Sequence, residues 1–224
     1  MRVYIIPLII GMGGVIVLLS LGIWQVQRLN WKISVLTEIK NKVSANPSVL
    51  PQKPSVDVDQ YKSVRLKGTL LAEEVHVLIS LKHIGPGYRL ISAFELGDRR
   101  ILIDQGFMSL DAKAKQRKKR EVDVVGSLYW PAEVDRFTPN PDYKKNIWFA
   151  RDVSELAKAL GTEPVLIVAS KITPEPRDVV SLPINTKRIP NNHLQYAITW
   201  FSLALVWATM TGYLVLGIKR QSTG

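Results

Sequence analysis

Two long stretches without a charged residue, one near each end of the chain, limit what this sequence can fold into. The first runs from Val3 to Gln27 and the second from Leu194 to Ile218. A helix rises about 1.5 Å per residue, so either stretch is long enough to cross a hydrocarbon core of about 30 Å. The first one has no small-residue cleavage site at its end, which favours a retained anchor over a cleaved signal peptide. We therefore expect an integral membrane protein with two transmembrane helices.

The charged residues are concentrated between these stretches. All 19 acidic residues lie from Glu38 to Asp178, and 27 of the 30 basic residues lie from Arg28 to Arg188. The absence of cysteine excludes a disulfide framework, thiolate catalysis and cysteine-ligated metal sites. The expected organisation is a tail and first transmembrane helix over residues 1–27, a charged domain over 28–192, a second transmembrane helix over 193–218 and a tail over 219–224.

The charges at the ends predict an orientation. Arg2 precedes the first stretch, and Lys219 and Arg220 follow the second. By the positive-inside rule, both termini are expected in the cytoplasm. The apolar stretch begins within a few residues of the start, without an Arg- and Ser-rich amphipathic leader, which favours a bacterial inner membrane with the central domain in the periplasm.

The middle of the chain has the pattern of a β-rich domain. Gly85-Pro86-Gly87 and Gly97-Asp98 are predicted to be turns between strands. An amphipathic helix is predicted over Val153–Leu160, with Asp152 near its start and Gly161 at its end. Alternating or continuous β-prone runs predict strands over Tyr61–Leu71, Glu74–Leu81, Tyr88–Glu95, Arg100–Phe107, Val122–Tyr129 and Val165–Ser170. We expect an α+β or barrel-like domain, with the first transmembrane helix continuing out of the membrane over Asn30–Val43.

No common catalytic motif is present. The chain lacks GxSxG, HExxH, P-loop and GxGxxG patterns. Its carboxylate pairs, Glu73-Glu74 and Asp57-x-Asp59, have a spacing that is usual in solvated turns, so we expect no enzyme activity. The run from Lys113 to Arg120 holds six bases in eight residues, which could bind nucleic acid or anionic lipid. No aromatic residue is interleaved with it, and Glu121 and Asp123 follow it. A charged loop between strands is the favoured reading, with no nucleic-acid partner.

The three histidines differ in their surroundings. His76 lies in a predicted strand and His83 near a predicted turn, whereas His193 lies where the second apolar stretch begins. Pro190 followed by Asn191 and Asn192 is typical of a helix start, with either asparagine as the N-cap. The positive end of the helix dipole favours neutral imidazole, which is the form that ligates metals.

Aromatic residues recur at helical spacing around these positions. His193, Tyr196, Trp200 and Trp207 share one face of the second helix, and Trp24, Arg28 and Trp31 recur in the same way at the end of the first. Together they would suit a haem, with imidazole for iron, guanidinium for a propionate and aromatic walls for the ring. The alternative is an ordinary interfacial belt of aromatic residues with a snorkelling arginine. The small residues Ala204, Ala208 and Gly212 predict a ridge for close contact with Gly11, Gly13 and Gly14 of the first helix.

The two ends of the charged middle also carry a family resemblance. Leu21-Gly-Ile-Trp-Gln-Val-Gln-Arg-Leu-Asn-Trp-Lys32 resembles the motif that ends the first span in the Surfeit locus protein 1 family. Pro190-Asn-Asn-His-Leu-Gln-Tyr-Ala-Ile-Thr-Trp-Phe201 resembles the motif that opens the second span. Between them, Gly87-Tyr88, Ile103-Asp-Gln-Gly-Phe107, Phe137-Thr-Pro-Asn-Pro-Asp142 and Trp148 follow in the family's order.

The resemblance implies a bacterial-type assembly factor for haem–copper cytochrome c oxidase of the aa3 type. It further implies binding of haem a at the outer membrane boundary, with His193 on the iron, and help with its insertion into oxidase subunit I. The cofactor site would then comprise His193, Tyr196, Trp200, Trp24 and Arg28. The alternative is a scaffold independent of haem, which holds subunit I or haem a synthase in the bilayer during assembly.

Overall fold

A computed structural model describes residues 5–82, 84–115, 117–186 and 189–221. The chain divides into two compact units. One consists of Met1–Glu38 together with Thr186–Gly224, and the other of Ile39–Asn185. The predicted domain limits at residues 28 and 192 therefore lie within the first unit. His83, Arg2 and the last three residues of the predicted tail lie outside the described residues.

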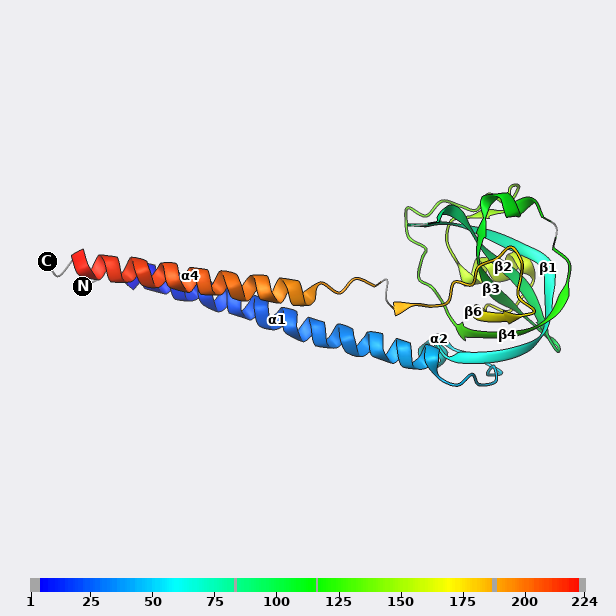
Figure 1. The fold of residues 1–224 in the computed structure, drawn as a ribbon, viewed down its shortest axis with the longest axis horizontal. Helices are drawn as coiled ribbons and strands as arrows, with labels where there is room; N and C mark the ends of the chain where they lie inside the picture. The colour runs from blue at the N-terminus through cyan, green and yellow to red at the C-terminus, as the bar shows by residue number, and fades with distance from the viewer. Residues whose placement is uncertain (1–4, 83, 116, 187–188, 222–224) are drawn as a thin grey trace. The chain divides into compact units, whose positions relative to one another are not determined.

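The first unit contains α4 (His193–Gln221) and all but the last six residues of a second long helix, α1 (Ile5–Ser44). Both are long and apolar enough to cross a membrane, and most of their apolar side chains are exposed. α1 extends the apolar stretch by a further helical segment, as the spacing from Asn30 to Val43 predicted. The two helices run side by side (Figure 1). The protein is thus an integral membrane protein whose two transmembrane helices flank a β-rich domain.

The contacts between α1 and α4 show that the helices are antiparallel. Gly11 lies against Thr211, Gly14 against Trp207 and Gly22 against Phe201, so residue numbers fall along one helix as they rise along the other. The Trp207 indole N–H donates to the Gly11 carbonyl at 3.0 Å. Side chains of α4 therefore pack against glycines of α1.

This packing corrects part of the predicted small-residue ridge. Ala204 is buried, but Ala208 and Gly212 are exposed, and no described atom lies within 4 Å of a Cβ built on Gly212 or on Gly13. A spacing of four residues drifts around a helix by about 40° per step, since four residues advance by about 400°. The predicted ridge therefore leaves the contact face after its first member.

The second unit is a closed barrel with one helix packed on its outside. Its strands are β1 (Ser63–Leu81), β2 (Gly85–Leu96), β3 (Arg99–Ser109), β4 (Arg120–Leu128), β5 (Ile147–Trp148) and β6 (Leu166–Thr173). The order is β2-β3-β6-β4-β1-β5, and a further pairing of β1 with β2 closes the ring. Among these strand pairs, β3 with β6 and β1 with β5 are parallel, and the others are antiparallel.

One strand closes the barrel because it pairs on both edges. The first half of β1 pairs with β4, the second half pairs with β2, and Leu70 is opposite both Phe94 and Arg120. The register shifts between Leu70 and Glu74, which is where the sequence predicted two separate strands. Gly85-Pro86-Gly87 was predicted as a turn, but it opens β2. The chain turns just before it, where the Ile84 N–H donates to the Leu81 carbonyl at 3.1 Å.

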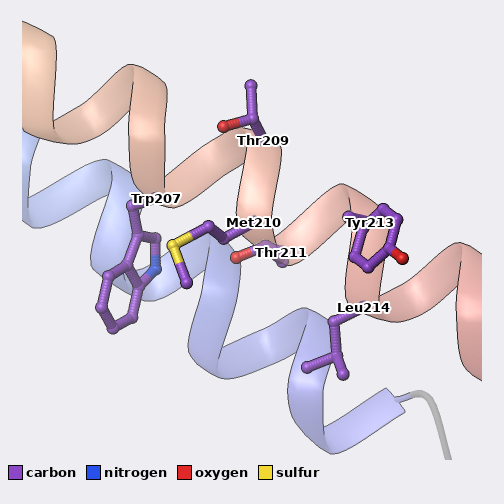
Figure 2. A pocket seen from close by; sticks show the side chains of 6 residues that line it. All are labelled: Trp207, Thr209, Met210, Thr211, Tyr213 and Leu214. Atoms are coloured by element: carbon purple, nitrogen blue, oxygen red, sulfur yellow. The ribbon is translucent and has the colours of Figure 1, made fainter.

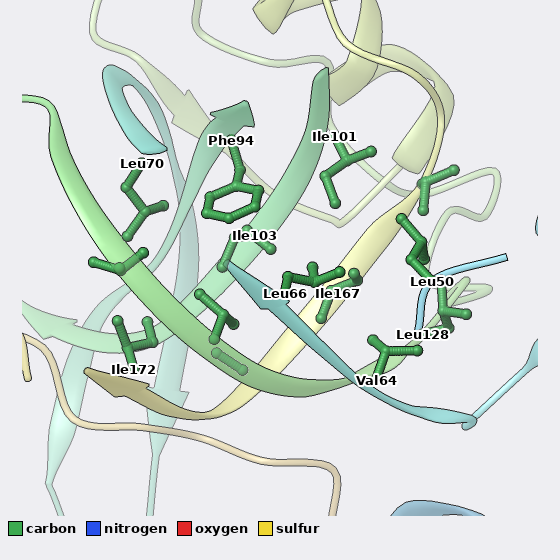
Figure 3. Close-up of a cluster of buried hydrophobic side chains, with 14 residues drawn as sticks. Leu50, Val64, Leu66, Leu70, Phe94, Ile101, Ile103, Leu128, Ile167 and Ile172 are labelled. Atoms are coloured by element: carbon green, nitrogen blue, oxygen red, sulfur yellow. The ribbon is translucent and has the colours of Figure 1, made fainter. Parts of the chain in front are cut away.

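Side chains on alternate faces of the strands pack into different clusters of buried apolar residues; a third, smaller cluster contains Tyr88, Leu90 and Met108. Ile101 and Ile103 point into the barrel, and Leu102 between them points outward to helix α3 (Val153–Leu160). Figure 3 shows the inner cluster, in which β-branched residues and leucines surround Phe94. α3 has the predicted ends. Asp152 accepts from the N–H groups of Ser154 and Glu155, and Gly161 is left-handed with φ of 60°. The short elements α2 (Val56–Asp59), η1 (Leu110–Ala114) and β5 were not predicted.

Candidate functional site

His193 is the first residue of α4. The Asn192 carbonyl accepts the Tyr196 N–H at 3.1 Å, so Asn192 occupies the N-cap position, one of the two predicted for it. Pro190 precedes this start and prevents the helix from extending backward. The local sequence therefore places an imidazole in the first helical turn, where the membrane span begins.

A hydrogen bond joins His193 to the other helix. Its Nδ1 lies 2.9 Å from Oε1 of Gln25, and Gln25 is only 9% exposed. Within the described ranges, Nε2 of His193 has no hydrogen bond, and the ring is half-buried. One edge of the imidazole is thus fixed to α1 while the other nitrogen remains open to a ligand.

The other predicted site residues surround this point but do not touch His193 through any hydrogen bond in the described part of the chain. Trp24 and Tyr196 are each 54% exposed, and Trp200 is half-buried. The Arg28 guanidinium lies over the Trp31 ring, 4.0 Å from its centroid. These side chains are therefore available at the surface of the helix pair.

Helix geometry puts all of them on the same side of the pair. Gln25 faces α4, and at about 100° per residue Trp24 lies about 100° and Arg28 about 60° to one side of it. On α4 the buried Ala197 faces α1, and Tyr196 and Trp200 lie at the same two angles from it. Because α4 runs antiparallel, these rotations lead to one common side. Ideal helix geometry thus puts the predicted residues on one side of the helix pair.

The predicted site residues lie at different levels along the axis of the helix pair. Measured from the level of His193 and Gln25, Arg28 lies about 4.5 Å toward the end where α4 begins, and Trp200 about 10 Å in the opposite direction. Trp24 and Tyr196 lie between these levels. The site therefore has a cation at its polar end and aromatic rings along its apolar side.

Trp207 lies far from His193 along α4. It was predicted to share the face of His193, but it lies 14 residues further along α4, which is about 21 Å. Figure 2 shows it beside a cavity of about 690 Å³ that is lined by Trp207, Thr209, Met210, Thr211, Tyr213 and Leu214. This cavity is lined by α4 residues near the opposite end of the span, so it is not part of the His193 site.

In the barrel, a fully buried carboxylate joins a structural network of charges. Asp104 is fully buried and accepts from Arg89 at 2.6 Å and from Arg151 at 3.3 Å, while Arg151 also pairs with Glu133. Burial raises the pKa of Glu133, but hydrogen bonds and charge from Arg151 outweigh it and lower the pKa overall. The four charges sum to zero, as a buried network requires.

The basic run is also engaged within the barrel unit. Lys113 donates to the Lys145 carbonyl, Lys115 to Asp178 and Arg120 to the Pro174 carbonyl. Arg117 pairs with Glu74 at 2.8 Å, and Glu74 also contacts the buried His76. The hydrogen bond from Lys115 lowers the pKa of Asp178. These contacts support the reading of the basic run as a charged connection whose side chains are paired within the domain, although Lys113 lies in η1 and Arg120 opens β4.

Gln25 is the site residue that the sequence reasoning missed. A signal was present, because Gly11, Leu18, Gly22 and Gln25 are separated by seven, four and three residues, the spacing of a helix-packing seam. Gln25 is the polar member of this seam, and a polar side chain in a seam inside a membrane needs a partner. The spacing of the aromatic residues does not indicate Gln25.

Comparisons with known proteins agree with the motifs at the span edges. The chain matches the SURF1 family over residues 13–205. It is 26% identical to Surfeit locus protein 1 of Xenopus tropicalis, over 82% of this chain and 67% of that protein. It is 28% identical to a SURF1-like protein of Caenorhabditis elegans, over 85% and 68%, and 25% identical to the human Surfeit locus protein 1, over 83% and 69%.

Proposed function

Because the chain belongs to the SURF1 family, we propose that it is an assembly factor for aa3-type cytochrome c oxidase that holds haem a at the outer membrane boundary. In this proposal haem a is a cargo that the protein passes to oxidase subunit I. The protein is a carrier and not an enzyme. It resides in the bacterial inner membrane, with its barrel in the periplasm and both termini in the cytoplasm. Haem a synthase is the proposed source of the cargo.

The observation that carries the proposal is the placement of His193. Its Nδ1 is held by Gln25, its Nε2 has no hydrogen bond in the described part of the chain, and the ring lies where the span begins. Ligating histidines in proteins characteristically have one ring nitrogen fixed by a neighbour and the other on the metal. The residues present therefore fit an iron porphyrin.

The surrounding side chains suit the rest of such a cargo. Arg28, at the polar end, would pair with a propionate, since guanidinium binds carboxylates strongly. Trp24, Tyr196 and Trp200 would contact the faces or edges of the macrocycle and keep water from the iron. The Asn191 side-chain oxygen, one residue from the N-cap, is buried without a hydrogen-bond partner in the described residues and would accept a hydrogen bond from a polar group of the ligand.

The test is to purify the full chain from cells that make haem a and to compare His193→Ala with the wild type. We expect the variant to lose bound haem and its absorption spectrum, and oxidase assembly to fall with it. Gln195→Ala, an exposed position on the same helix, is the matched control and should keep both. Unchanged haem content and spectrum in His193→Ala would remove that residue from the ligand role.

A haem-independent scaffold is the second candidate. It is favoured by exposed aromatic side chains in the barrel unit, where Phe137 is 75% and Tyr143 is 66% exposed within a segment that carries no helix. Such side chains commonly mark surfaces for partner proteins. If His193→Ala lost haem but still supported oxidase assembly, the scaffold would be the better account.

A further inference from the structure

The seam between the two membrane helices contains one feature that packing does not explain. Apart from Gln25, the buried residues of α1 in the described chain are glycines. Gln27, two residues on, is exposed, so an amide side chain in this segment is not confined to the seam. A buried amide in a membrane is expensive unless it is hydrogen-bonded, so its position needs a reason.

The chemistry of the contact supplies that reason. In the structure the Gln25 atom facing His193 is the side-chain carbonyl oxygen, which accepts hydrogen bonds and cannot donate them. With the amide in this orientation, Nδ1 of His193 is the donor of the hydrogen bond. In a neutral imidazole only one nitrogen carries a proton, so Nε2 then has a free lone pair.

We propose that Gln25 is a positioning residue that fixes the proton of His193 on Nδ1 and so keeps Nε2 in the state that can bind iron. This inference deepens the proposed function and rests on it for its purpose, but the placement of the proton can be measured without any cargo. It also explains why α1 and α4 must be paired at this level. The ligand is on one helix and the group that prepares it is on the other, 168 positions away in the chain.

A different role for Gln25 would be to hold the helices together. Both roles involve the same hydrogen bond. Two substitutions separate them, because one keeps the hydrogen-bond acceptor and the other keeps only the apolar packing. In Gln25→Glu the side chain keeps an acceptor for Nδ1–H, whereas in Gln25→Leu it keeps the apolar packing and loses the acceptor. A positioning role predicts rescue by Glu and loss with Leu, even where the helices stay paired.

The first experiment measures the proton directly. The full chain is labelled with ¹⁵N-histidine in detergent micelles, and the signals of His193 are identified by their absence in His193→Ala; with three histidines in the chain, the spectra remain simple. We expect protonated Nδ1 and unprotonated Nε2 in the wild type, in Gln25→Glu and in the control Gln27→Leu. In Gln25→Leu the Nε2-protonated form should become substantial. A wild type protonated on Nε2, or a Gln25→Leu spectrum identical to it, would overturn the proposal.

The second experiment titrates the same proteins with iron protoporphyrin IX and follows the Soret band. Loss of an outer hydrogen-bond partner of a metal ligand typically weakens binding by about 10- to 100-fold. We expect that loss for Gln25→Leu, near wild-type affinity for Gln27→Leu and recovery to within a few-fold for Gln25→Glu. Equal affinity in Gln25→Leu and the wild type would contradict the positioning role.

The two experiments separate failure of this inference from failure of the proposed function. If His193→Ala bound the porphyrin as well as the wild type, the proposed ligand would be wrong, yet the ¹⁵N spectra would still decide whether Gln25 fixes the proton. If His193→Ala abolished binding and Gln25→Leu did not, the ligand would stand and the role of Gln25 would fall.

Discussion

Individual side chains in the barrel unit hold its loops by charge, and Arg99 with Glu163 is the clearest pair. Arg99 donates through Nε to one Glu163 oxygen at 2.9 Å and through Nη2 to the other at 2.6 Å. The same guanidinium donates to the Pro51 carbonyl at 2.9 Å, which ties the segment before α2 to the start of β3. The hydrogen bond from Arg99 is the main reason why the pKa of Glu163 is lowered.

This pair predicts a defined dependence of stability on pH. A carboxyl whose pKa is lower in the folded state stabilises the fold above its unfolded pKa, about 4.3 for Glu, and loses that contribution as the pH falls through the folded value. We expect Glu163→Gln to lower the free energy of unfolding at pH 7 by up to about 1 kcal/mol, since the side chain is partly exposed. The difference from wild type should shrink steadily below about pH 4.

Urea unfolding of the full chain in detergent at several pH values measures this difference. Glu73→Gln is the control, because its carboxylate lies 3.8 Å from Arg100 and is 60% exposed. A Glu163→Gln deficit that stayed constant down to pH 3 would show that the ion pair is not its source.

At the scale of elements, pairing of α1 with α4 depends on glycines that leave room for large side chains. A Cβ built on Gly22 would lie 2.6 Å from Cε1 of Phe201, whereas one built on Gly13 would meet no described atom within 4 Å. We expect Gly22→Leu to force the helices apart, because no real Cβ contact is that short and the Phe201 ring fills the space.

Cysteine cross-linking tests that prediction without interference, since the chain has no cysteine of its own. Leu18→Cys and Ala204→Cys occupy facing positions in the antiparallel register and should form a disulfide on mild oxidation. Adding Gly22→Leu should abolish the cross-link, and adding Gly13→Leu should leave it intact. Equal cross-linking in both backgrounds would mean that the Gly22–Phe201 contact does not set the spacing.

The elements also show what the sequence could and could not reveal. α3 was predicted with its bounds and both caps, because Asp152 and Gly161 act locally. The spans were predicted because length and charge suffice for them. A barrel-like domain was one of the two predicted classes, but the pairing that closes the barrel was not predicted, since β1 pairs with strands on both edges and such pairing depends on residues far apart in the chain. The prediction of the small-residue ridge was partly wrong for a similar reason, because which small residues form the contact depends on the partner helix.

The candidate site follows the same division. His193 and the aromatic residues were found because they recur at helical spacing next to a helix start. Gln25 was missed because its meaning depends on the opposite helix, and a glutamine at a membrane boundary is unremarkable until its partner is known. A local pattern can indicate a ligand, whereas the group that orients the ligand requires the fold.

At the scale of the whole molecule, two transmembrane helices place both termini on one side and the barrel on the other. Single cysteines test the orientation, because the natural chain has none. We expect Phe137→Cys, at an exposed position of the barrel, to react with a membrane-impermeant maleimide added to spheroplasts. Arg220→Cys, at the end of α4, should react only after the membrane is permeabilised. The reverse pattern would place the barrel in the cytoplasm.

The hydrogen bond between Gln25 and His193 also has a consequence for biosynthesis. Its two partners are separated by nearly the whole protein, so the ribosome makes Gln25 first and completes the barrel before it reaches His193. At about 5–20 residues per second, the wait is on the order of ten to thirty seconds. A nascent or truncated chain can have an anchor and a full barrel yet lack a prepared imidazole. Under the proposed function, only a chain that has been synthesised through the start of α4 would bind its cargo.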